Sequence, residues 1–344
     1  MGDAGALHEL LAGGEALTIV CHNNPDPDCL ASAIALGRIA AHAGIDERRI
    51  VYSGEITHQQ NRAFINLLSV TIHPFDSETI RDRPDDHLIA FVDHSTPGEN
   101  NRVPDGTAVD IVIDHHPAEE IEARYVDHRE SIGATATILT QYLLELEIEI
   151  GTPLATALVF AIRRETLEFL RGVTAAEYAA AAELHDRADS DLLRKLSTPS
   201  VSGATIDSIA DAIRNRTVRG SVLITHVERA SERDALPQAA DYLATLEGVE
   251  TAIVFGIIER TIHISARTTD SRVHIGETLN GAFDDVGSAG GHQDMAGGEI
   301  PLGIFADVAD DEDEPIDAVV ARIVTRRLVT EMNLPDETGN RSGR

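Results

Sequence analysis

Short apolar runs alternate with longer stretches of helical periodicity through the first half of the chain. The apolar runs include ALTIV, RIVYSG, LIAFV and VDIVI, and the helical stretches include CLASAIALGRIAAHAG, NRAFINLL and ATATILTQYLLEL. This alternation is typical of parallel strands that are buried on both faces and connected by helices. It predicts an α/β fold with a doubly wound parallel sheet, in which ligands bind at the carboxyl ends of the strands.

A second block of strands and helices begins near residue 220. It contains the strand-like runs VETAIVFGII and TIHISART, a glycine-rich stretch GSAGGHQDMAGGEIP and the helical PIDAVVARIVTRRLVTEM. The segment before it includes STPSVSGAT, whose small and polar residues are typical of a connector. We therefore predict a first domain over 1–189, a linker over 190–219, a second, smaller α/β domain over 220–335 and a mobile tail over 336–344.

The charge of the chain is strongly acidic. Asp and Glu total 58 against 28 Lys and Arg, which gives a formal net charge of −30 at pH 7, and Lys195 is the only lysine. The 42% hydrophobic content is too high for a disordered acidic chain, so the acid must coat a folded surface. Concentrated salt would screen the self-repulsion of such a surface, which predicts a halophilic protein. An ordinary acidic cytoplasmic protein is the alternative.

The sequence offers no segment for a membrane and no framework for disulfides. No window approaches about 18 consecutive apolar residues, and the N-terminus lacks the features of a signal peptide. We therefore expect a cytoplasmic protein without membrane contact. The two cysteines, Cys21 and Cys29, are expected to be small buried residues, because no other soft ligands accompany them.

Histidines and carboxylates gather where the predicted strands end. These candidate ligands are His22, Asp26, Asp28, Asp93, Asp114, His115, His116 and Glu165. An oxygen-rich set with a few imidazoles favours Mn²⁺ or Mg²⁺ over a structural zinc, and one carboxylate could bridge two such ions. Many hydrolases that cleave phosphoesters use two neighbouring cations. Taken singly, the same stretches also fit purely structural roles: Asp26 as a helix N-cap, and IDHHP as a strand that ends in a turn.

Five stretches taken together resemble a known family. HNNPDPD, FVDHS, VIDHHP, SIGATATIL and GGHQDMAGG occur in the order found in DHH-family phosphoesterases that carry a C-terminal DHHA1 domain. The resemblance runs from about Ala16 to Pro301. It is strongest to the short-oligonucleotide hydrolases and phosphoadenosine phosphatases called nanoRNases, with cyclic-dinucleotide phosphodiesterases as near relatives.

The resemblance implies two metal positions in the first domain. His22 and Asp26 would hold the first ion, and Asp28 and His115 would hold the second. Asp93 would bridge the two ions. The first domain would thus be the metal-binding catalytic domain, and the cofactor would be two Mn²⁺ or Mg²⁺ ions.

The resemblance also implies roles for residues that bind no metal. Asp114 would orient the imidazole of His115, and His116 would act with Asp93 in catalysis by facing the phosphate or the leaving group. The second domain would bind substrate through Arg267, Gly290, Gly291 and His292. Glycine lets backbone N–H groups approach a phosphate closely, and an arginine can hold two phosphate oxygens.

One position departs from the family. The usual Asp-Thr pair is replaced by Glu165-Thr166 after two arginines, Arg163 and Arg164. Glutamate keeps the charge with one more methylene, so we expect Glu165 to be a ligand of the second ion. The arginines could pair with substrate phosphates, with Glu168, or face solvent.

The stretch SIGATATIL is a predicted helix start. The free N–H groups around Ser131, Gly133 and Thr135 favour an anion or a metal-bound carboxylate, although a plain helix cap explains much of the pattern.

These observations predict a metal-dependent phosphoesterase. Its expected substrates are short oligoribonucleotides, 3′-phosphoadenosine 5′-phosphate or cyclic dinucleotides, and a homodimer is possible. Three rivals remain: a RecJ-like single-strand exonuclease, a family II inorganic pyrophosphatase, and a catalytically silent nucleotide sensor. The pyrophosphatase resemblance expects a different second domain, a long-strand nuclease needs a basic groove, and a sensor would bind nucleotide without consuming it.

Overall fold

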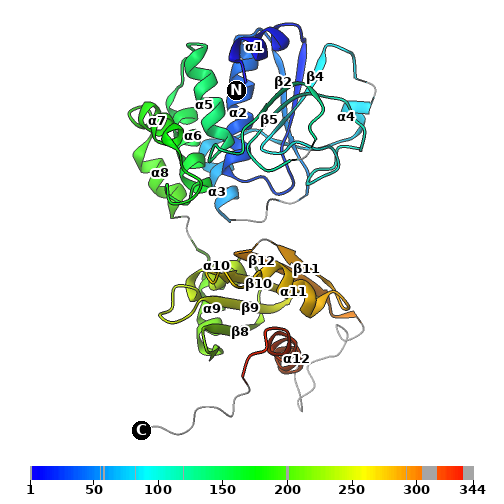
Figure 1. Ribbon diagram of the computed structural model, residues 1–344, viewed down its shortest axis with the longest axis vertical. Coiled ribbons are helices and arrows are strands. Elements are labelled where there is room, and N and C mark those ends of the chain that lie inside the picture. The colour runs from blue at the N-terminus through cyan, green and yellow to red at the C-terminus, as the bar shows by residue number, and fades with distance from the viewer. Residues whose placement is uncertain are drawn as a thin grey trace. The chain divides into compact units, whose positions relative to one another are not determined.

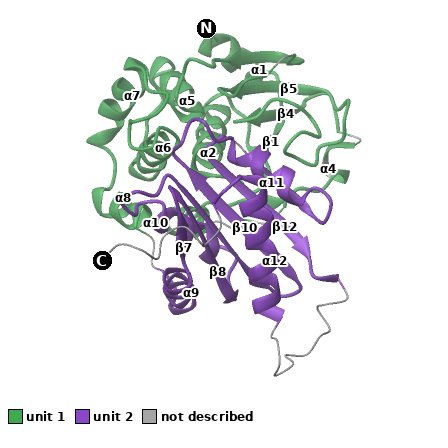
Figure 2. Ribbon diagram, turned by 60° about the horizontal axis from the view of Figure 1, so that its bottom comes forward, with its two compact units in different colours: residues 1–199 green, residues 200–344 purple. Residues whose placement is uncertain are grey.

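The computed structural model describes residues 2–54, 56, 59–81, 83–118, 120–198, 201–291, 293–303 and 316–335. The chain divides into two compact units, residues 1–199 and 200–344, which are coloured separately in Figure 2. None of the helices in the described ranges is long and apolar enough to cross a membrane.

The first unit consists of a parallel sheet and the helices that cover it. Its strands are β1 (Ala16–Val20), β2 (Glu47–Tyr52), β3 (His73–Pro74), β4 (His87–Val92), β5 (Val109–Asp114) and β6 (Ala123–His128). Its helices are α1 (Ala4–Ala12), α2 (Pro27–His42), α3 (Gln59–Leu68), α4 (Glu78–Arg81), α5 (Thr135–Glu145), α6 (Thr152–Glu165), α7 (Ala175–His185) and α8 (Ser190–Ser197). Figure 1 shows these elements in the blue to green part of the chain.

The strand order confirms the predicted doubly wound parallel sheet. The six strands lie in the order β3-β2-β1-β4-β5-β6, and all neighbours are parallel. The direction of winding reverses between β1 and β4. In sheets of this kind, ligands bind outside the carboxyl ends of the strands at the reversal point.

The continuous apolar runs are explained by burial on both faces of this sheet. Along β4, Leu88, Ala90 and Val92 belong to the core under α2, α5 and α6. The intervening Ile89 and Phe91 face a second core that includes Ile80 of α4. Successive side chains of a strand point to opposite faces, so both sets must be apolar.

The polar stretch after β1 also starts helix α2. Asp26 is the N-cap, and its Oδ1 accepts the backbone N–H groups of Asp28 at 2.9 Å and Cys29 at 3.1 Å. Pro27 occupies the first turn, where its missing N–H costs nothing. The prediction that Asp26 is a helix N-cap is therefore confirmed. Asp26 also lies in the site described below.

The second unit has a mixed sheet between two layers of helices. Its elements are α9 (Gly203–Arg214), β7 (Thr217–Arg219), β8 (Val222–Arg229), α10 (Ala235–Leu243), β9 (Thr251–Ile258), β10 (Thr261–Thr268), α11 (Ile275–Phe283), β11 (Ser288–Gly291), β12 (Met295–Pro301) and α12 (Ile316–Glu331). The strand order is β11-β12-β10-β9-β8-β7, and only β8 and β9 are parallel among the pairs. One core packs under α9 and α10 and the other under α11 and α12, which confirms a second α/β domain.

The segment 190–219 is more ordered than a simple connector. It contains helices α8 and α9 and strand β7, so much of the expected linker is built into the two units. The exact domain limits given above stay predictions.

Candidate metal centre

The candidate ligands of the first unit meet at the carboxyl ends of three neighbouring strands. His22 follows β1, Asp93 follows β4, and Asp114 ends β5 ahead of His115 and His116. Since β1 and β4 flank the reversal point of the sheet, the site lies where this topology places ligands.

Asp93 lies between two histidines. Its Oδ2 is 3.6 Å from His22 Nε2, and its Oδ1 is 3.6 Å from His115 Nε2. The Asp93 side chain is 1% exposed, and its backbone adopts a left-handed conformation with φ 66°. That conformation is uncommon for a residue other than glycine and costs about 1–3 kcal/mol. The turn allows a side chain at the end of β4 to present one oxygen to each histidine.

The hydrogen bonds of the two histidines fix which ring nitrogen faces Asp93. His22 Nδ1 is 2.9 Å from the carbonyl of Asn23, and His115 Nδ1 is 3.1 Å from the carbonyl of Ile132. A carbonyl can only accept, so each Nδ1 carries a proton, and Nε2, which faces Asp93, is the ring atom that could offer its lone pair to a cation. His115 Nε2 is buried without a hydrogen-bond partner among the described residues. Lone pairs facing a carboxylate are the arrangement that a cation between them would satisfy.

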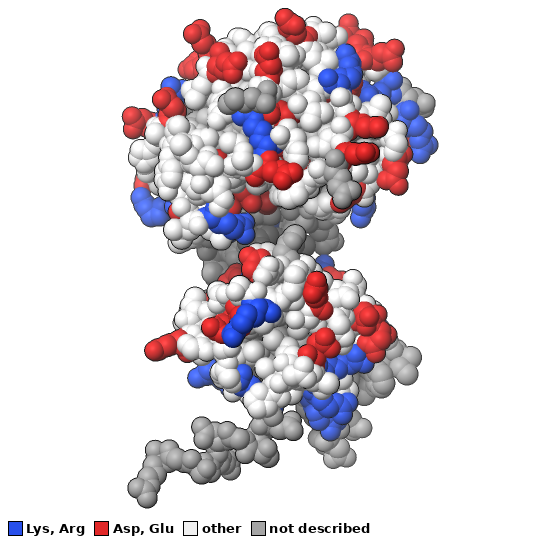
Figure 3. All heavy atoms as spheres, in the orientation of Figure 1, with Lys and Arg blue, Asp and Glu red and all other residues white. Residues whose placement is uncertain are grey.

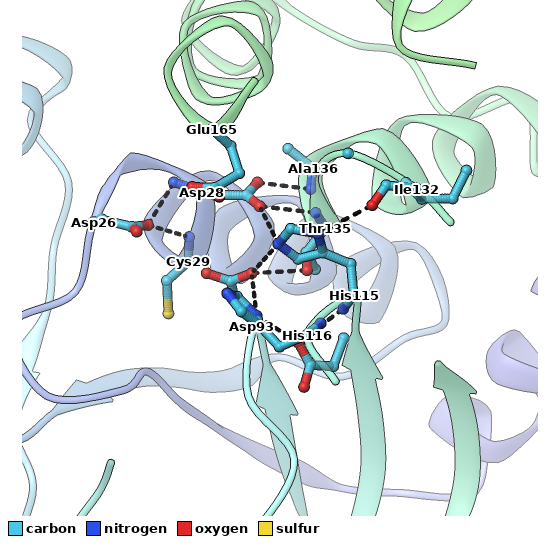
Figure 4. Close-up of polar contacts among 12 residues, drawn as sticks. Asp26, Asp28, Cys29, Asp93, His115, His116, Ile132, Thr135, Ala136 and Glu165 are labelled. Atoms are coloured by element: carbon cyan, nitrogen blue, oxygen red, sulfur yellow. Dashed lines mark hydrogen bonds and ion pairs between the residues drawn. The ribbon is translucent and has the colours of Figure 1, made fainter. Parts of the chain in front are cut away.

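Asp26 and Asp28, both labelled in Figure 4, each add a carboxylate near one of the two histidines. Asp26 Oδ1 is 3.9 Å from His22 Nε2, and Asp28 Oδ2 is 3.9 Å from His115 Nε2. Each histidine therefore has one aspartate of its own and shares Asp93. These residues fit two cations, as the resemblance implies.

The start of α5 holds two of these carboxylates. The N–H groups of Thr135 and Ala136 donate to the two oxygens of Asp28 at 2.8 Å each. The Thr135 hydroxyl donates to Asp93 Oδ1, also at 2.8 Å. The helix start predicted from SIGATATIL thus binds a carboxylate, as its free N–H groups favour.

The carboxylates of the site repel one another. Burial, followed by the charge of Asp93, raises the pKa of Asp26 and of Asp28. Burial alone would also raise the pKa of Asp93, but the hydrogen bond from His22 and the charge of His116 hold it at about 2. Bound cations would stabilise this concentration of negative charge in a buried site.

Asp114 has a different partner from the one expected. The His116 ring places Nδ1 3.0 Å from Asp114 Oδ1, while the His115 ring is held by Ile132 instead. Asp114 Oδ1 also accepts the backbone N–H groups of His115 and His116. The expectation that Asp114 orients the His115 imidazole is therefore wrong, because the turn after β5 brings the carboxylate to the neighbouring ring. The hydrogen bond to Asp114 raises the pKa of His116 to about 9.

Glu165 lies at the end of α6 and points toward Asp28 (Figure 4). Burial, together with the charges of Asp26 and Asp93, raises its pKa. Its Oε1 is 3.5 Å from an Arg171 guanidinium nitrogen. The position is compatible with the expected role as a metal ligand, which stays a prediction.

The arginine in front of this glutamate is engaged within the protein. Arg163 Nε donates to Glu168 Oε2 at 2.7 Å, so the alternative in which Arg163 pairs with Glu168 is confirmed.

Two residues near the site were missed as functional candidates. Cys29 is buried as expected, yet its Sγ lies within 4.8 Å of ligand atoms of His22 and Asp93. His94 stacks on Phe91 with ring centroids 4.5 Å apart, and burial lowers its pKa to about 4. The one sequence feature that could have identified them is position, because Cys29 directly follows Asp28 and His94 directly follows Asp93.

The predicted substrate-binding residues of the second unit lie at one end of its sheet. Arg267 in β10 pairs with Met295 of β12, and Gly291 in β11 pairs with the adjacent Ala296. Arg267 Nε donates to Asp241 Oδ1 of α10 at 2.6 Å. A Cβ on Gly290 would meet nothing within 4 Å, so this backbone is open to an approaching group. His292 lies outside the described residues.

Comparisons with known proteins agree with this arrangement. The model of the DHH family, N-terminal domain, matches residues 16–162, and the model of the DHHA1 domain matches residues 219–324. An uncharacterized protein of Methanocaldococcus jannaschii is 43% identical over 298 residues, which are 86% of this chain and 60% of that relative. The chain thus spans less than two thirds of the length of this relative.

Other relatives carry names that bear on chemistry. A probable manganese-dependent inorganic pyrophosphatase of Bacillus mycoides is 30% identical over 251 residues, which are 70% of this chain and 78% of that protein. The crystal structure of an exopolyphosphatase-related protein from Bacteroides fragilis has a TM-score of 0.72 at 14% identity, and the match covers 96% of this chain and 97% of that one. The latter likeness shows a shared fold.

The two family models match in the order expected from the motifs, and together they include most of the chain. The chain therefore belongs to the DHH family and carries a DHH domain followed by a DHHA1 domain.

Proposed function

We propose that this protein is a two-metal phosphoesterase that hydrolyses short oligoribonucleotides, 3′-phosphoadenosine 5′-phosphate or cyclic dinucleotides. The observation that carries the proposal is the position of Asp93, with each carboxylate oxygen 3.6 Å from a different histidine. A carboxylate shared in this way is what a pair of neighbouring cations requires.

The proposed ligands divide into two sets around Asp93. His22 and Asp26 would hold one ion, and Asp28, His115 and Glu165 the other. The donors are mainly oxygen with some imidazole, which suits Mn²⁺ or Mg²⁺, and several relatives are named manganese-dependent. When bound, two such ions polarise the phosphoryl group and make water a nucleophile near neutral pH.

His116 is proposed to supply a proton to the leaving oxygen. Its side chain is 50% exposed, and the bond between its Nδ1 and Asp114 raises its pKa to about 9. The imidazolium form therefore prevails at neutral pH, and its Nε2–H remains for donation. Asp114 would stabilise that positive charge without taking the proton itself.

Substrate binding is assigned to the second unit. Arg267 and the Gly290-Gly291 backbone lie at the same end of the sheet, two strands apart. Asp241 fixes the guanidinium of Arg267 from one side. A phosphate of a nucleotide would take the remaining donors of the guanidinium and the backbone N–H groups.

Specific observations bear on two alternative functions: they favour a pyrophosphatase as the second candidate and argue against a long-strand exonuclease. The named relatives favour inorganic pyrophosphate as a second candidate substrate. Against a long-strand exonuclease, acidic and basic side chains of the described residues are interspersed on the face shown in Figure 3, and the basic ones form no continuous strip there. Such a strip is what binds a long polyanion.

The test is hydrolysis by the purified full chain in molar KCl with Mn²⁺. The substrates are 5′-phosphorylated diadenylate, 3′-phosphoadenosine 5′-phosphate, a cyclic dinucleotide and pyrophosphate, each assayed separately. Asp93→Asn is the blank, and its fold is checked by circular dichroism. Release of AMP or phosphate from a nucleotide, or opening of the cyclic dinucleotide to its linear form, by the wild type alone supports the proposal. Cleavage of pyrophosphate alone, or no cleavage by folded and metal-loaded protein, refutes it and favours the pyrophosphatase or the silent sensor respectively.

A further inference from the structure

The first metal position has a sulfur atom beside it. Cys29 Sγ, the ligand atom of His22 and a carboxylate oxygen of Asp93 all lie within 4.8 Å of one another. Cys29 is fully buried; its thiol donates to the carbonyl of Val92 at 3.5 Å and lies beside the side chains of His22 and Cys21. Figure 4 shows the Cys29 sulfur on the side of α2 on which the Asp93 carboxylate lies.

The helix geometry separates Cys29 from Asp28. Consecutive residues of an α-helix project about 100° apart. Asp28 points to the start of α5 and to His115, at the second position. Cys29 therefore points elsewhere, toward His22 at the first position.

The other candidate ligand of the first position, Asp26, has one oxygen occupied by the helix cap. Asp26 Oδ1 accepts two backbone N–H groups as the cap of α2 and is 3.9 Å from His22 Nε2. An ion held by His22, Asp26 and Asp93 would still take a fourth donor, because ions such as Zn²⁺ are usually four-coordinate. The Nε2 atom of His22 is already directed inward by the Nδ1 contact with Asn23.

We propose that Cys29 is a thiolate ligand of the first metal position and that it makes this position select Zn²⁺, Co²⁺ or Fe²⁺ over Mn²⁺. The inference rests on the proposed two-metal centre. As the metal–sulfur bond forms, the thiol proton passes to solvent. The second position has only oxygen and imidazole donors, so it keeps its preference for Mn²⁺ or Mg²⁺.

The three ligand atoms lie within 4.8 Å of one another, close to the separation that a shared ion requires. A zinc ion binds sulfur at about 2.3 Å and carboxylate oxygen at about 2.0–2.2 Å, so two such donors lie at most ~4.5 Å apart. Sets that combine cysteine, histidine and carboxylate are ordinary zinc ligands. Small side-chain shifts would bring the three atoms onto one ion.

The experiment titrates metal-free full-length protein with Co²⁺ under a phosphine reductant. A thiolate ligand produces an ultraviolet sulfur-to-cobalt charge-transfer band. We expect the band in the wild type and in Cys21→Ser, the matched control, since Cys21 is also buried and is adjacent to Cys29. We expect its loss in Cys29→Ser, together with an unchanged Mn²⁺ affinity and a drop in Zn²⁺ affinity of more than about 10-fold, which is the smallest effect usually seen for loss of a mere outer-shell partner.

A second measurement needs no variant. X-ray absorption of the zinc-loaded wild type should show a sulfur neighbour at about 2.3 Å. Cobalt binding without a charge-transfer band, a band that survives Cys29→Ser, or a zinc shell without sulfur would each overturn the proposal. These readouts involve no turnover. A sulfur ligand in a protein that cleaves no nucleotide would therefore refute the proposed function and leave this inference standing, and nucleotide cleavage without a sulfur ligand would do the reverse.

Discussion

Replacing Thr135 by valine removes one hydrogen bond from the proposed metal centre and nearly keeps the shape of the side chain. The hydroxyl donates to Asp93 Oδ1 at 2.8 Å, and both side chains are buried. This bond helps to hold Asp93 in the orientation in which each oxygen faces a different histidine. Without this bond, the Asp93 carboxylate has to be fixed in that orientation when the ions bind, which weakens metal binding.

The size of the effect follows from that one bond. A hydrogen bond to a charged group contributes about 1.5–3 kcal/mol, and loss of a partner behind a metal ligand costs about 10- to 100-fold in metal affinity. The two ranges agree, since tenfold in affinity is about 1.4 kcal/mol. At a fixed Mn²⁺ concentration far above the dissociation constant, Thr135→Val should therefore lose about 1.4–2.7 kcal/mol of the stabilisation that Mn²⁺ gives to the wild type.

The same helix provides a matched control. Thr137 is also fully buried in α5, but its hydroxyl has no hydrogen-bond partner among the described residues. Thr137→Val makes the same chemical change without removing a bond. Titration calorimetry gives the Mn²⁺ affinity of each variant, and denaturant unfolding with chelator or Mn²⁺ gives the stabilisation. Equal Mn²⁺ affinities for the two variants would show that Thr135 does not support Asp93.

Two further variants test parts of the structure away from the metal centre. Asp127→Asn should destabilise the first unit by about 3–5 kcal/mol at pH 7, because it leaves Arg129, whose side chain is only 9% exposed, without its charged partner. Arg129 lowers the pKa of Asp127 against the effect of burial, so this stability is present above the unfolded value of about 3.9 and is lost as the pH falls through the lower folded pKa. Urea unfolding of the wild type and the variant at pH 7 and pH 3 checks this prediction. If the two proteins differ in free energy of unfolding by the same amount at both pH values, the prediction is refuted. Gly291→Ala should cost about 1–3 kcal/mol, because φ is 152° and the new Cβ would lie 2.5 Å from the Met295 carbonyl; Gly290→Ala, with open space around its Cβ, is the control, and equal melting temperatures would contradict the prediction.

The fold and the general place of the site could be predicted because each rests on a local pattern. A parallel strand buried on both faces, such as β4, reads as a continuous apolar run. The polar residues that follow such runs must gather at one edge of the sheet. Asp26 was recognisable as an N-cap because Pro27 and a helical pattern follow it.

The finer contacts depend on turns that the sequence does not reveal. The turn after β5 decides that Asp114 reaches the ring of His116 and leaves His115 to the carbonyl of Ile132. The rotation of α2 decides that Cys29 faces His22 and Asp93. Both outcomes depend on a fraction of a helical turn or on one pair of backbone angles, and residue type alone does not fix these.

The first unit breaks several local rules at one place, and a shared cause explains them. Asp93 adopts a left-handed backbone, burial and like charge raise the pKa of Asp26 and Asp28, and His115 Nε2 lies buried without a hydrogen-bond partner among the described residues. Each feature is unfavourable by itself, and a core of ordinary residues would avoid all of them. Cations between the carboxylates and the imidazoles would stabilise every one of these groups at once. The same cations should therefore stabilise the folded unit, so metal binding and the stability of the DHH domain are expected to be coupled.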